Sequence, residues 1–137
     1  MSRLVADASV VIKWILEEPG SDDAALLIAG ADQVYAPEIV LAECANAIWK
    51  RVARGWMDIE NAPTPLGDLM ALPILLFSLR PLAPSALDLA LSYDHPIYDC
   101  YYLAAAIAND CPLTTADRRL HELAVRAGLG ERAILVG

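Results

Sequence analysis

The chain has 137 residues, enough for one domain with its own core and no need of disulfides or metal to hold it together. Its 10 basic and 18 acidic residues give a net charge of −8, which argues against a protein that coats nucleic acid with Lys and Arg. The acidic balance still allows an enzyme that reaches phosphates through bound metal, and it suits a basic protein partner. We expect a single domain over residues 1–137.

The chain is predicted to begin with a strand and two helices. Residues 3–8 are too continuously apolar for a half-exposed strand, so we expect a buried strand there. Ser9 can cap a helix that ends before the segment EEPGS. Ser21 or Asp22 can cap a second helix, over residues 21–31.

A strand and a long amphipathic helix come next. The segment QVYAP, residues 33–37, reads as a short strand. Residues 38–54 carry apolar side chains three and four positions apart, which predicts a helix that Gly55 closes. Two prolines interrupt the helical pattern of residues 58–72, so the conformation of that segment stays open.

The remaining elements complete an alternation of strands and helices. In chain order we expect a strand at 73–79, helices at 83–94 and 98–110, a strand at 111–116, a helix at 117–128 and a strand at 132–137. Such alternation is typical of a parallel sheet covered on both faces, so we predict an α/β fold with three layers, α/β/α. The ligand crevice of such a sheet lies beyond the carboxyl ends of the strands, where strand order reverses.

The apolar segments and cysteines bear on the compartment. No stretch of about 18 apolar residues is free of charge, so we expect no membrane span, and residues 1–9 show no signal peptide. Cys44, Cys100 and Cys111 lie in apolar contexts and are predicted to be reduced core residues. We therefore expect a cytoplasmic protein.

Four acidic residues stand out by position. Asp7 ends the first strand and Asp117 follows the strand at 111–116, so their carboxylates should share one crevice if those strands are neighbours. Asp99 opens a helix, and each of these three residues can equally be a helix-capping or first-turn acid. Glu43 lies in the middle of helix 38–54 on a partly apolar stripe, and pairing with Lys50 or Arg51 is its alternative role.

Taken together, the four acids predict a metal site. Clustered carboxylates repel one another and raise each other's pKa unless a cation compensates. Ligands that are all oxygen favour hard cations such as Mg²⁺ or Mn²⁺. Because Mg²⁺ acts on phosphates, the chemistry indicated is phosphodiester hydrolysis by metal-activated water.

The chain resembles a known family in four segments, ADAS, LAECANAIWK, HPIYDCYYLAAAIA and LTTADRRL, which look like the four acidic motifs of PIN-domain ribonucleases. The order and spacing are similar to those of the toxins of VapBC-type toxin–antitoxin pairs. The resemblance implies a PIN-like fold and a Mg²⁺-dependent endoribonuclease, with Mn²⁺ as a substitute ion, that cuts RNA. It implies that the catalytic and metal-binding residues are Asp7, Glu43, Asp99 and Asp117.

The resemblance also covers neighbouring residues. Ser9 and Thr115 match polar positions beside the metal, and Asn46 lies one turn from the glutamate. Arg118 can contact substrate phosphate, with solvated surface charge as the alternative. Arg118 and Arg119 stand where some relatives carry another acid, which leaves open whether one or two metal ions bind.

His95 and five aromatic residues are predicted to have structural roles. His95 precedes Pro96 and is predicted to be a turn residue, with a general base as the alternative. The aromatic residues are expected in core or dimer packing, with base stacking as the alternative. They are Trp14, Trp49, Trp56, Tyr101 and Tyr102.

Two kinds of protein partner are expected. The high apolar content near Trp14, Leu16 and Ile39 predicts a homodimer, as the resemblance also implies. A cognate antitoxin is expected to lay a basic, apolar C-terminal segment over helix 38–54 and to place an Arg or Lys near the acids.

Two other functions compete with the nuclease. A phosphatase or phosphotransferase would use Asp7 as nucleophile, but such chemistry favours a second acid two residues later, where Ser9 stands. A non-catalytic interaction domain with an acidic pocket, of the receiver type, would carry a late lysine, whereas the lysines here are Lys13 and Lys50.

Overall fold

A parallel sheet forms the middle layer of the computed structural model, which describes residues 2–137. Within that range the sheet has five strands in the order β3-β2-β1-β4-β5, and every neighbouring pair is parallel. The strands are β1 Arg3–Ala6, β2 Gln33–Pro37, β3 Ile74–Phe77, β4 Leu113–Thr115 and β5 Ala133–Leu135. Strand order reverses between β1 and β4, so the predicted parallel sheet is confirmed.

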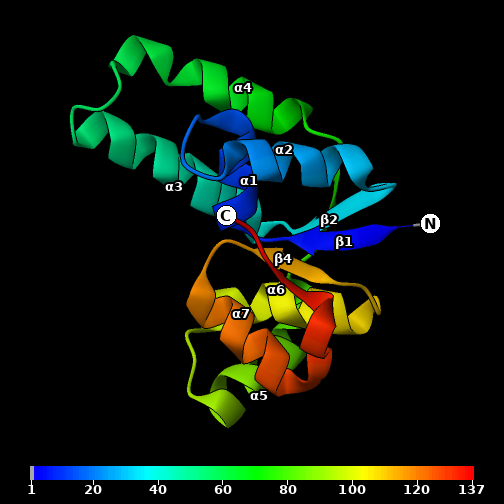
Figure 1. Cartoon of the computed structure of the whole chain (residues 1–137). Helices are drawn as coiled ribbons and strands as arrows, with labels where there is room; N and C mark the ends of the chain where they lie inside the picture. The colour runs from blue at the N-terminus through cyan, green and yellow to red at the C-terminus, as the bar shows by residue number, and fades with distance from the viewer. Residues whose placement is uncertain (1) are drawn as a thin grey trace.

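Helices cover both faces of the sheet, which confirms the predicted three-layer architecture (Figure 1). One layer contains α1 Ala8–Ile15, α2 Ser21–Gly30, α3 Ile39–Ala53 and α4 Pro63–Ala71. The other contains α5 Ala83–Tyr93, α6 Ile97–Ala108 and α7 Arg118–Ala124. Shorter helical turns lie at Ile59–Asn61, Arg80–Leu82, Val125–Leu129 and Gly130–Arg132.

The core explains why the central strands are so continuously apolar. Val5 and Ala6 of β1 and Leu113 of β4 are fully buried, because helices cover both faces of the strands that carry them. The small residues of α6, Ala104 to Ala106, are buried as well. Their short side chains let α6 pack closely against the middle of the sheet.

The predicted serine caps are wrong, whereas the alternative role of Asp7 as a helix cap is confirmed. Asp7, not Ser9, is the N-cap of α1: its backbone is extended and its carboxylate accepts a hydrogen bond from the Val10 N–H. Gly20, not Ser21 or Asp22, precedes α2, with a left-handed φ of 91° that glycine adopts without strain. The Ser21 hydroxyl instead donates to the Leu16 carbonyl.

The open segment at 58–72 forms a helical turn followed by a helix. The turn spans Ile59–Asn61, and Pro63 is the first residue of α4. Pro65 also lies in the first turn of α4, where a backbone N–H has no acceptor within the helix. The prolines therefore begin this helix instead of breaking it.

The three cysteines lie in the core, as expected. Cys44, Cys100 and Cys111 are buried and unpaired with one another, as predicted for core thiols. No helix within residues 2–137 has the length and apolar content needed to cross a membrane.

Candidate functional site

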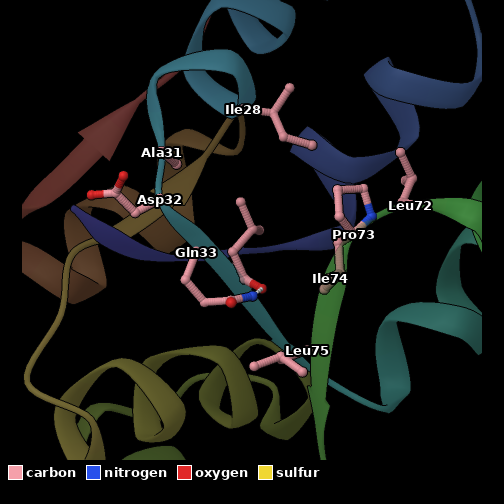
Figure 2. Close-up of a pocket in the computed structure, with 9 residues that line it drawn as sticks. Ile28, Ala31, Asp32, Gln33, Leu72, Pro73, Ile74 and Leu75 are labelled. Atoms are coloured by element: carbon pink, nitrogen blue, oxygen red, sulfur yellow. Dashed lines mark hydrogen bonds between the residues drawn. The ribbon is translucent and has the colours of Figure 1, made fainter. Parts of the chain in front are cut away.

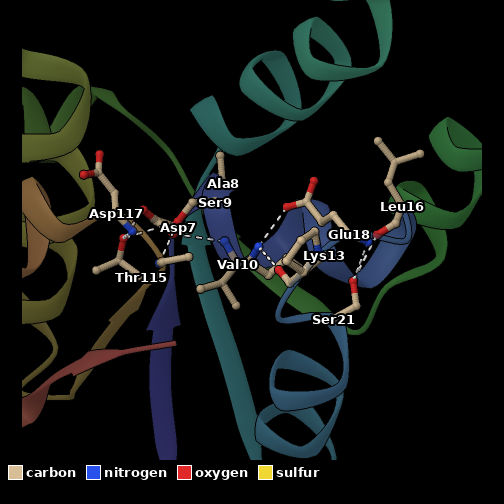
Figure 3. A network of polar contacts seen from close by, with 12 residues as sticks. Asp7, Ala8, Ser9, Val10, Lys13, Leu16, Glu18, Ser21, Thr115 and Asp117 are labelled. Atoms are coloured by element: carbon tan, nitrogen blue, oxygen red, sulfur yellow. Dashed lines mark hydrogen bonds and ion pairs between the residues drawn. The ribbon is translucent and has the colours of Figure 1, made fainter. Parts of the chain in front are cut away.

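Asp7 lies at the reversal of strand order, at the carboxyl end of β1, with 4% of its surface exposed. Its Oδ1 accepts hydrogen bonds from the Ser9 hydroxyl at 2.6 Å and the Val10 N–H at 3.2 Å. Its Oδ2 accepts one from the Thr115 hydroxyl of β4 at 2.6 Å (Figure 3). The strand β4 and the first turn of α1 therefore both hold the Asp7 carboxylate in place.

Burial dominates the electrostatics of Asp7. It raises the pKa of the carboxyl from 3.8 to about 7, although Ser9, Thr115 and the Val10 N–H all stabilise the charged form. The negative charge of Asp99 raises the pKa further. Asp7 makes no ion pair with a basic side chain among residues 2–137.

Glu43 is half-buried in the second turn of α3 and points toward the same region. Its Oε1 accepts a hydrogen bond from the Tyr102 hydroxyl at 2.6 Å. Burial raises the pKa of Glu43, the hydrogen bond from Tyr102 opposes that shift, and the charge of Asp99 adds to it. The alternative pairing with Lys50 or Arg51 is absent within residues 2–137, because Arg51 instead binds Glu18 at 3.0 Å.

Asp99 lies in the first turn of α6 and is held by His95. His95 Nε2 lies 2.8 Å from Asp99 Oδ2, within hydrogen-bonding distance. Asp94, with a left-handed φ of 51°, ends α5, and Pro96 precedes α6, so the turn directs the imidazole toward the helix start. The expectation that His95 is a turn residue is confirmed, but its contact with Asp99 was missed.

Asp117 caps α7 and is connected to Asp7 through the hydroxyl of Thr115. Its Oδ1 accepts a hydrogen bond from the Arg119 N–H at 2.9 Å, and its own N–H donates to the Thr115 hydroxyl at 3.0 Å. Figure 3 shows its carboxylate pointing away from that of Asp7. The strands that carry the two acids are neighbours, as expected, yet the carboxylates do not face each other directly.

The remaining predicted residues surround these acids. The Ser9 hydroxyl accepts a hydrogen bond from the Ala116 N–H at 2.8 Å and lies 3.3 Å from the Thr115 hydroxyl. Asn46 is exposed and, with Glu43, lines a cavity of about 270 Å³ between α1 and α3. Arg118 is exposed at the start of α7.

Basic side chains near the site fall into two groups. Lys13 binds Glu18 at 2.9 Å and the Pro19 carbonyl at 2.7 Å (Figure 3). Arg51 also binds Glu18, so Lys13 and Arg51 are both paired within the fold. Arg118, Arg119 and Lys50 make no ion pair within residues 2–137.

The four acids share one pattern: part of each carboxylate is held by the chain. The holding groups are Ser9 and Val10 at Asp7 Oδ1, Tyr102 at Glu43 Oε1, His95 at Asp99 Oδ2 and Arg119 at Asp117 Oδ1. The second oxygens of Glu43, Asp99 and Asp117 accept no hydrogen bond within residues 2–137, and Asp7 Oδ2 accepts only that of Thr115.

This donor set fits a hard divalent cation in its chemistry, because held carboxylates with free oxygens and mutual repulsion are what such an ion compensates. The side chains as they lie do not form a coordination sphere. Within the described chain, no three His, Cys, Asp or Glu residues come together closely enough to hold a metal ion.

Comparisons with known proteins identify the family of the chain. The family model described as PIN domain matches residues 4–126. Ribonuclease VapC3 of Pyrobaculum aerophilum is 29% identical over 122 residues, which cover 88% of this chain and 93% of that protein. Ribonuclease VapC1 of Mycobacterium tuberculosis H37Rv is 30% identical over 125 residues, 88% of this chain and 90% of its own.

Solved structures share the fold at lower identity. PAE2754 from Pyrobaculum aerophilum superposes with a TM-score of 0.71 at 21% identity, over 89% of this chain and 84% of its own. A toxin–antitoxin complex from Klebsiella pneumoniae gives 0.58 at 16% identity, over 83% and 86%. FitAcB from Neisseria gonorrhoeae gives 0.56 at 20% identity, over 88% and 92%.

Proposed function

Because the chain belongs to the PIN-domain family, among the VapC ribonucleases, we propose that it is a metal-dependent endoribonuclease that serves as the toxin of a toxin–antitoxin pair. The observation that carries the proposal is the set of acids at the carboxyl edge of the sheet. Asp7 and Glu43 each lie within electrostatic reach of Asp99, and none of the three is paired with a Lys or Arg within residues 2–137.

Asp7, Glu43, Asp99 and Asp117 would hold the cation, Mg²⁺ or Mn²⁺, which supplies an activated water and offsets phosphate charge. Ser9 and Thr115 orient Asp7 through their hydroxyls, and His95 orients Asp99. Arg118 contacts the RNA backbone from the start of α7, and Asn46 contacts it from the cavity beside Glu43.

Use of Asp7 as a covalent nucleophile is disfavoured by its surroundings. Both oxygens accept short hydrogen bonds, from Ser9 and Thr115, and little of the side chain is exposed. Such chemistry also favours a second acid two residues later, where Ser9 stands and donates its hydroxyl hydrogen to Asp7.

The test is RNA cleavage by the purified protein with added Mg²⁺ or Mn²⁺. Asp99→Asn should reduce cleavage at least about hundredfold, because a direct ligand should matter more than an outer-shell group, whose loss costs about 10- to 100-fold. Asp88→Asn, on the exposed side of α5, is the matched control and should keep wild-type activity. Wild-type cleavage by Asp99→Asn would overturn the proposal.

An apolar groove on α3 supports the antitoxin partner. It has a volume of about 460 Å³ between α3 and α4 and includes Ile48, Trp49, Val52 and Leu66. Trp49 is 62% exposed. Trp49 follows Glu43 by six residues on α3, about 9 Å along the helix, so an apolar segment in the groove can extend a basic side chain to the acids.

The antitoxin proposal is tested with the cognate antitoxin. Replacing the basic residue of its C-terminal segment by Ala should release RNA cleavage, and excess Mg²⁺ should compete with the unaltered antitoxin. Trp49→Ala in the toxin should weaken binding without altering cleavage by the free enzyme. Unchanged inhibition by the altered antitoxin, with no competition from Mg²⁺, would show that the partner does not recognise the acids.

We still propose a homodimer, but the apolar residues first expected to form its interface lie elsewhere. Trp14, Leu16 and Ile39 pack into the protein's own core, and the Trp14 indole N–H donates to the Ala24 carbonyl at 2.6 Å. The exposed apolar residues Leu87 and Leu91 of α5 support an interface on the opposite layer. Sedimentation of a monomer at tens of micromolar would contradict this, since an ordinary specific interface should hold at that concentration.

A further inference from the structure

Tyr102 is a buried tyrosine whose hydroxyl touches the site. It lies on α6 three residues after Asp99, and 1% of its surface is exposed. A buried phenol requires a hydrogen-bond partner. Within residues 2–137 its side chain has one, Glu43 Oε1 at 2.6 Å, on a residue 59 positions earlier in the chain.

This hydrogen bond joins the two helical layers. Glu43 belongs to α3 and Tyr102 to α6, which cover opposite faces of the sheet (Figure 1). Within the described chain it is the one side-chain hydrogen bond between these two helices. The same helix, α6, therefore supplies Asp99 itself and the group that holds Glu43.

The Tyr102 hydroxyl is the donor of this hydrogen bond, and the Glu43 carboxylate oxygen accepts it. Glu43 Oε1 is thereby occupied, while Oε2 accepts no hydrogen bond within residues 2–137.

We propose that Tyr102 is a positioning residue, which fixes the Glu43 carboxylate so that its second oxygen is presented to the divalent cation. This inference rests on the proposed function, because it assumes a cation beside Asp7 and Asp99. Without the hydroxyl, the half-buried carboxylate is free to turn into the neighbouring cavity. There it meets Lys50, which lines the same cavity and makes no ion pair within residues 2–137.

The test is Tyr102→Phe, which removes one oxygen atom and keeps the ring. Calorimetric titration of the metal-free variant with Mn²⁺ should show about 10- to 100-fold weaker binding, the usual effect of losing an outer-shell hydrogen bond. Tyr98→Phe is the matched control on the same helix, because Tyr98 is 61% exposed, and its Mn²⁺ affinity should equal that of the wild type. With saturating Mn²⁺, cleavage by Tyr102→Phe should recover most of its lost rate.

A second pair of variants separates positioning from a general structural role. In a Glu43→Ala background, Tyr102→Phe should weaken Mn²⁺ binding no further, since Tyr102 acts only through the Glu43 carboxylate. An equal loss in both backgrounds, or a Tyr102→Phe protein that is unfolded at the assay temperature, would overturn the positioning role.

The outcomes also distinguish this inference from the proposed function. If the wild type binds Mn²⁺ and cuts RNA, Asp99→Asn does neither, and Tyr102→Phe behaves as the wild type, only the role of Tyr102 is wrong. If the wild type itself neither binds Mn²⁺ nor cuts RNA, the proposed function is wrong, and the role of Tyr102 is overturned with it.

Discussion

Asp7 and Asp32 lie at opposite ends of the sheet and differ in their burial and in their hydrogen bonds. Asp7 follows β1 at the carboxyl end, where it is buried and accepts three hydrogen bonds. Asp32 precedes β2 at the amino end, where it is exposed and accepts a hydrogen bond from the Ser2 N–H at 2.6 Å. Figure 2 shows Asp32 beside a cavity with mostly apolar lining, including Ile28, Leu72 and Ile74.

The difference follows from the direction of the helices. At the carboxyl end, helices begin: Asp7 and Asp117 are N-caps and Asp99 lies in a first turn, so three helix N-termini favour negative charge there. At the amino end α2 finishes at Gly30, two residues before Asp32, and a helix C-terminus disfavours an anion. The helix termini therefore favour negative charge more at the carboxyl end of the sheet than at the amino end.

The largest predicted effect is on catalysis. Asp7→Asn should lower RNA cleavage at least about hundredfold, because it removes the charge of a proposed metal ligand. Asp32→Asn should leave the rate within about twofold of the wild type, since it changes the exposed end of the sheet. The measurement is the initial rate of RNA cleavage at fixed Mg²⁺, and equal losses in both variants would contradict the comparison.

The sequence predicts those features of the site that depend on neighbouring residues, but not those that depend on residues far apart in the chain. Asp7 and Asp117 could be placed because each directly follows a short apolar strand, and parallel strands align their carboxyl ends. The holding contacts could not, since Tyr102 and Glu43 are 59 residues apart and meet only after the layers pack. A tyrosine three residues after Asp99 was the available signal, because that spacing shares a helix face.

The missed helix caps have a local cause. Serine is a good N-cap, so Ser9 and Ser21 were reasonable candidates. The strand β1 ends at Ala6, two residues before the predicted end at residue 8, which puts Asp7 in the cap position. At α2, Gly20 precedes the helix in a left-handed conformation. The N-cap preferences of residue types do not predict such a backbone conformation.

The second prediction concerns stability of the metal-free protein. The folded-state pKa of Asp7, about 7, lies above its ordinary 3.8, so folding favours the protonated form. This contribution is complete below about pH 4 and is lost as the pH rises through 7. Asp7→Asn removes the charge, so at pH 8 it should raise the free energy of unfolding, by an upper bound of about 4 kcal/mol.

Urea unfolding at pH 5 and pH 8 measures this effect. The advantage of Asp7→Asn should be clear at pH 8 and should shrink at pH 5, where the wild-type carboxyl is protonated in the folded state. Asp32→Asn should show no such change with pH. An advantage for Asp7→Asn that grows toward acid would contradict the burial of a charged Asp7.

The third prediction uses metal to separate the two ends. A cation that binds only the folded protein should stabilise it by about 2.7 kcal/mol at 100 times its dissociation constant. Wild type and Asp32→Asn should both gain this stability with Mn²⁺, and a chelator should remove it. Asp7→Asn and Asp99→Asn should gain much less, as measured by thermal unfolding with and without Mn²⁺.

The smallest predicted effect is a stability difference between two threonine variants, which tests whether the carboxyl end of the sheet differs from the amino end by charge or by burial alone. Thr114 and Thr115 are adjacent, fully buried threonines of β4. The Thr114 hydroxyl donates to the Val5 carbonyl at 3.1 Å, whereas the Thr115 hydroxyl donates to Asp7 at 2.6 Å. Replacing either by Val leaves a buried acceptor without its donor, which costs about 1–3 kcal/mol.

The two variants should differ in their dependence on pH. At pH 8 the Asp7 carboxylate is charged, so Thr115→Val removes a charge-assisted hydrogen bond and should cost more than Thr114→Val in urea unfolding. Below pH 7 Asp7 takes up a proton in the folded state, so the extra cost of Thr115→Val should diminish toward pH 5, while that of Thr114→Val stays constant. Parallel curves for both variants would mean that the carboxyl end differs from the amino end by burial only. A gap that opens with rising pH would mean that this edge of the sheet is built around a negative charge, as a cation site requires.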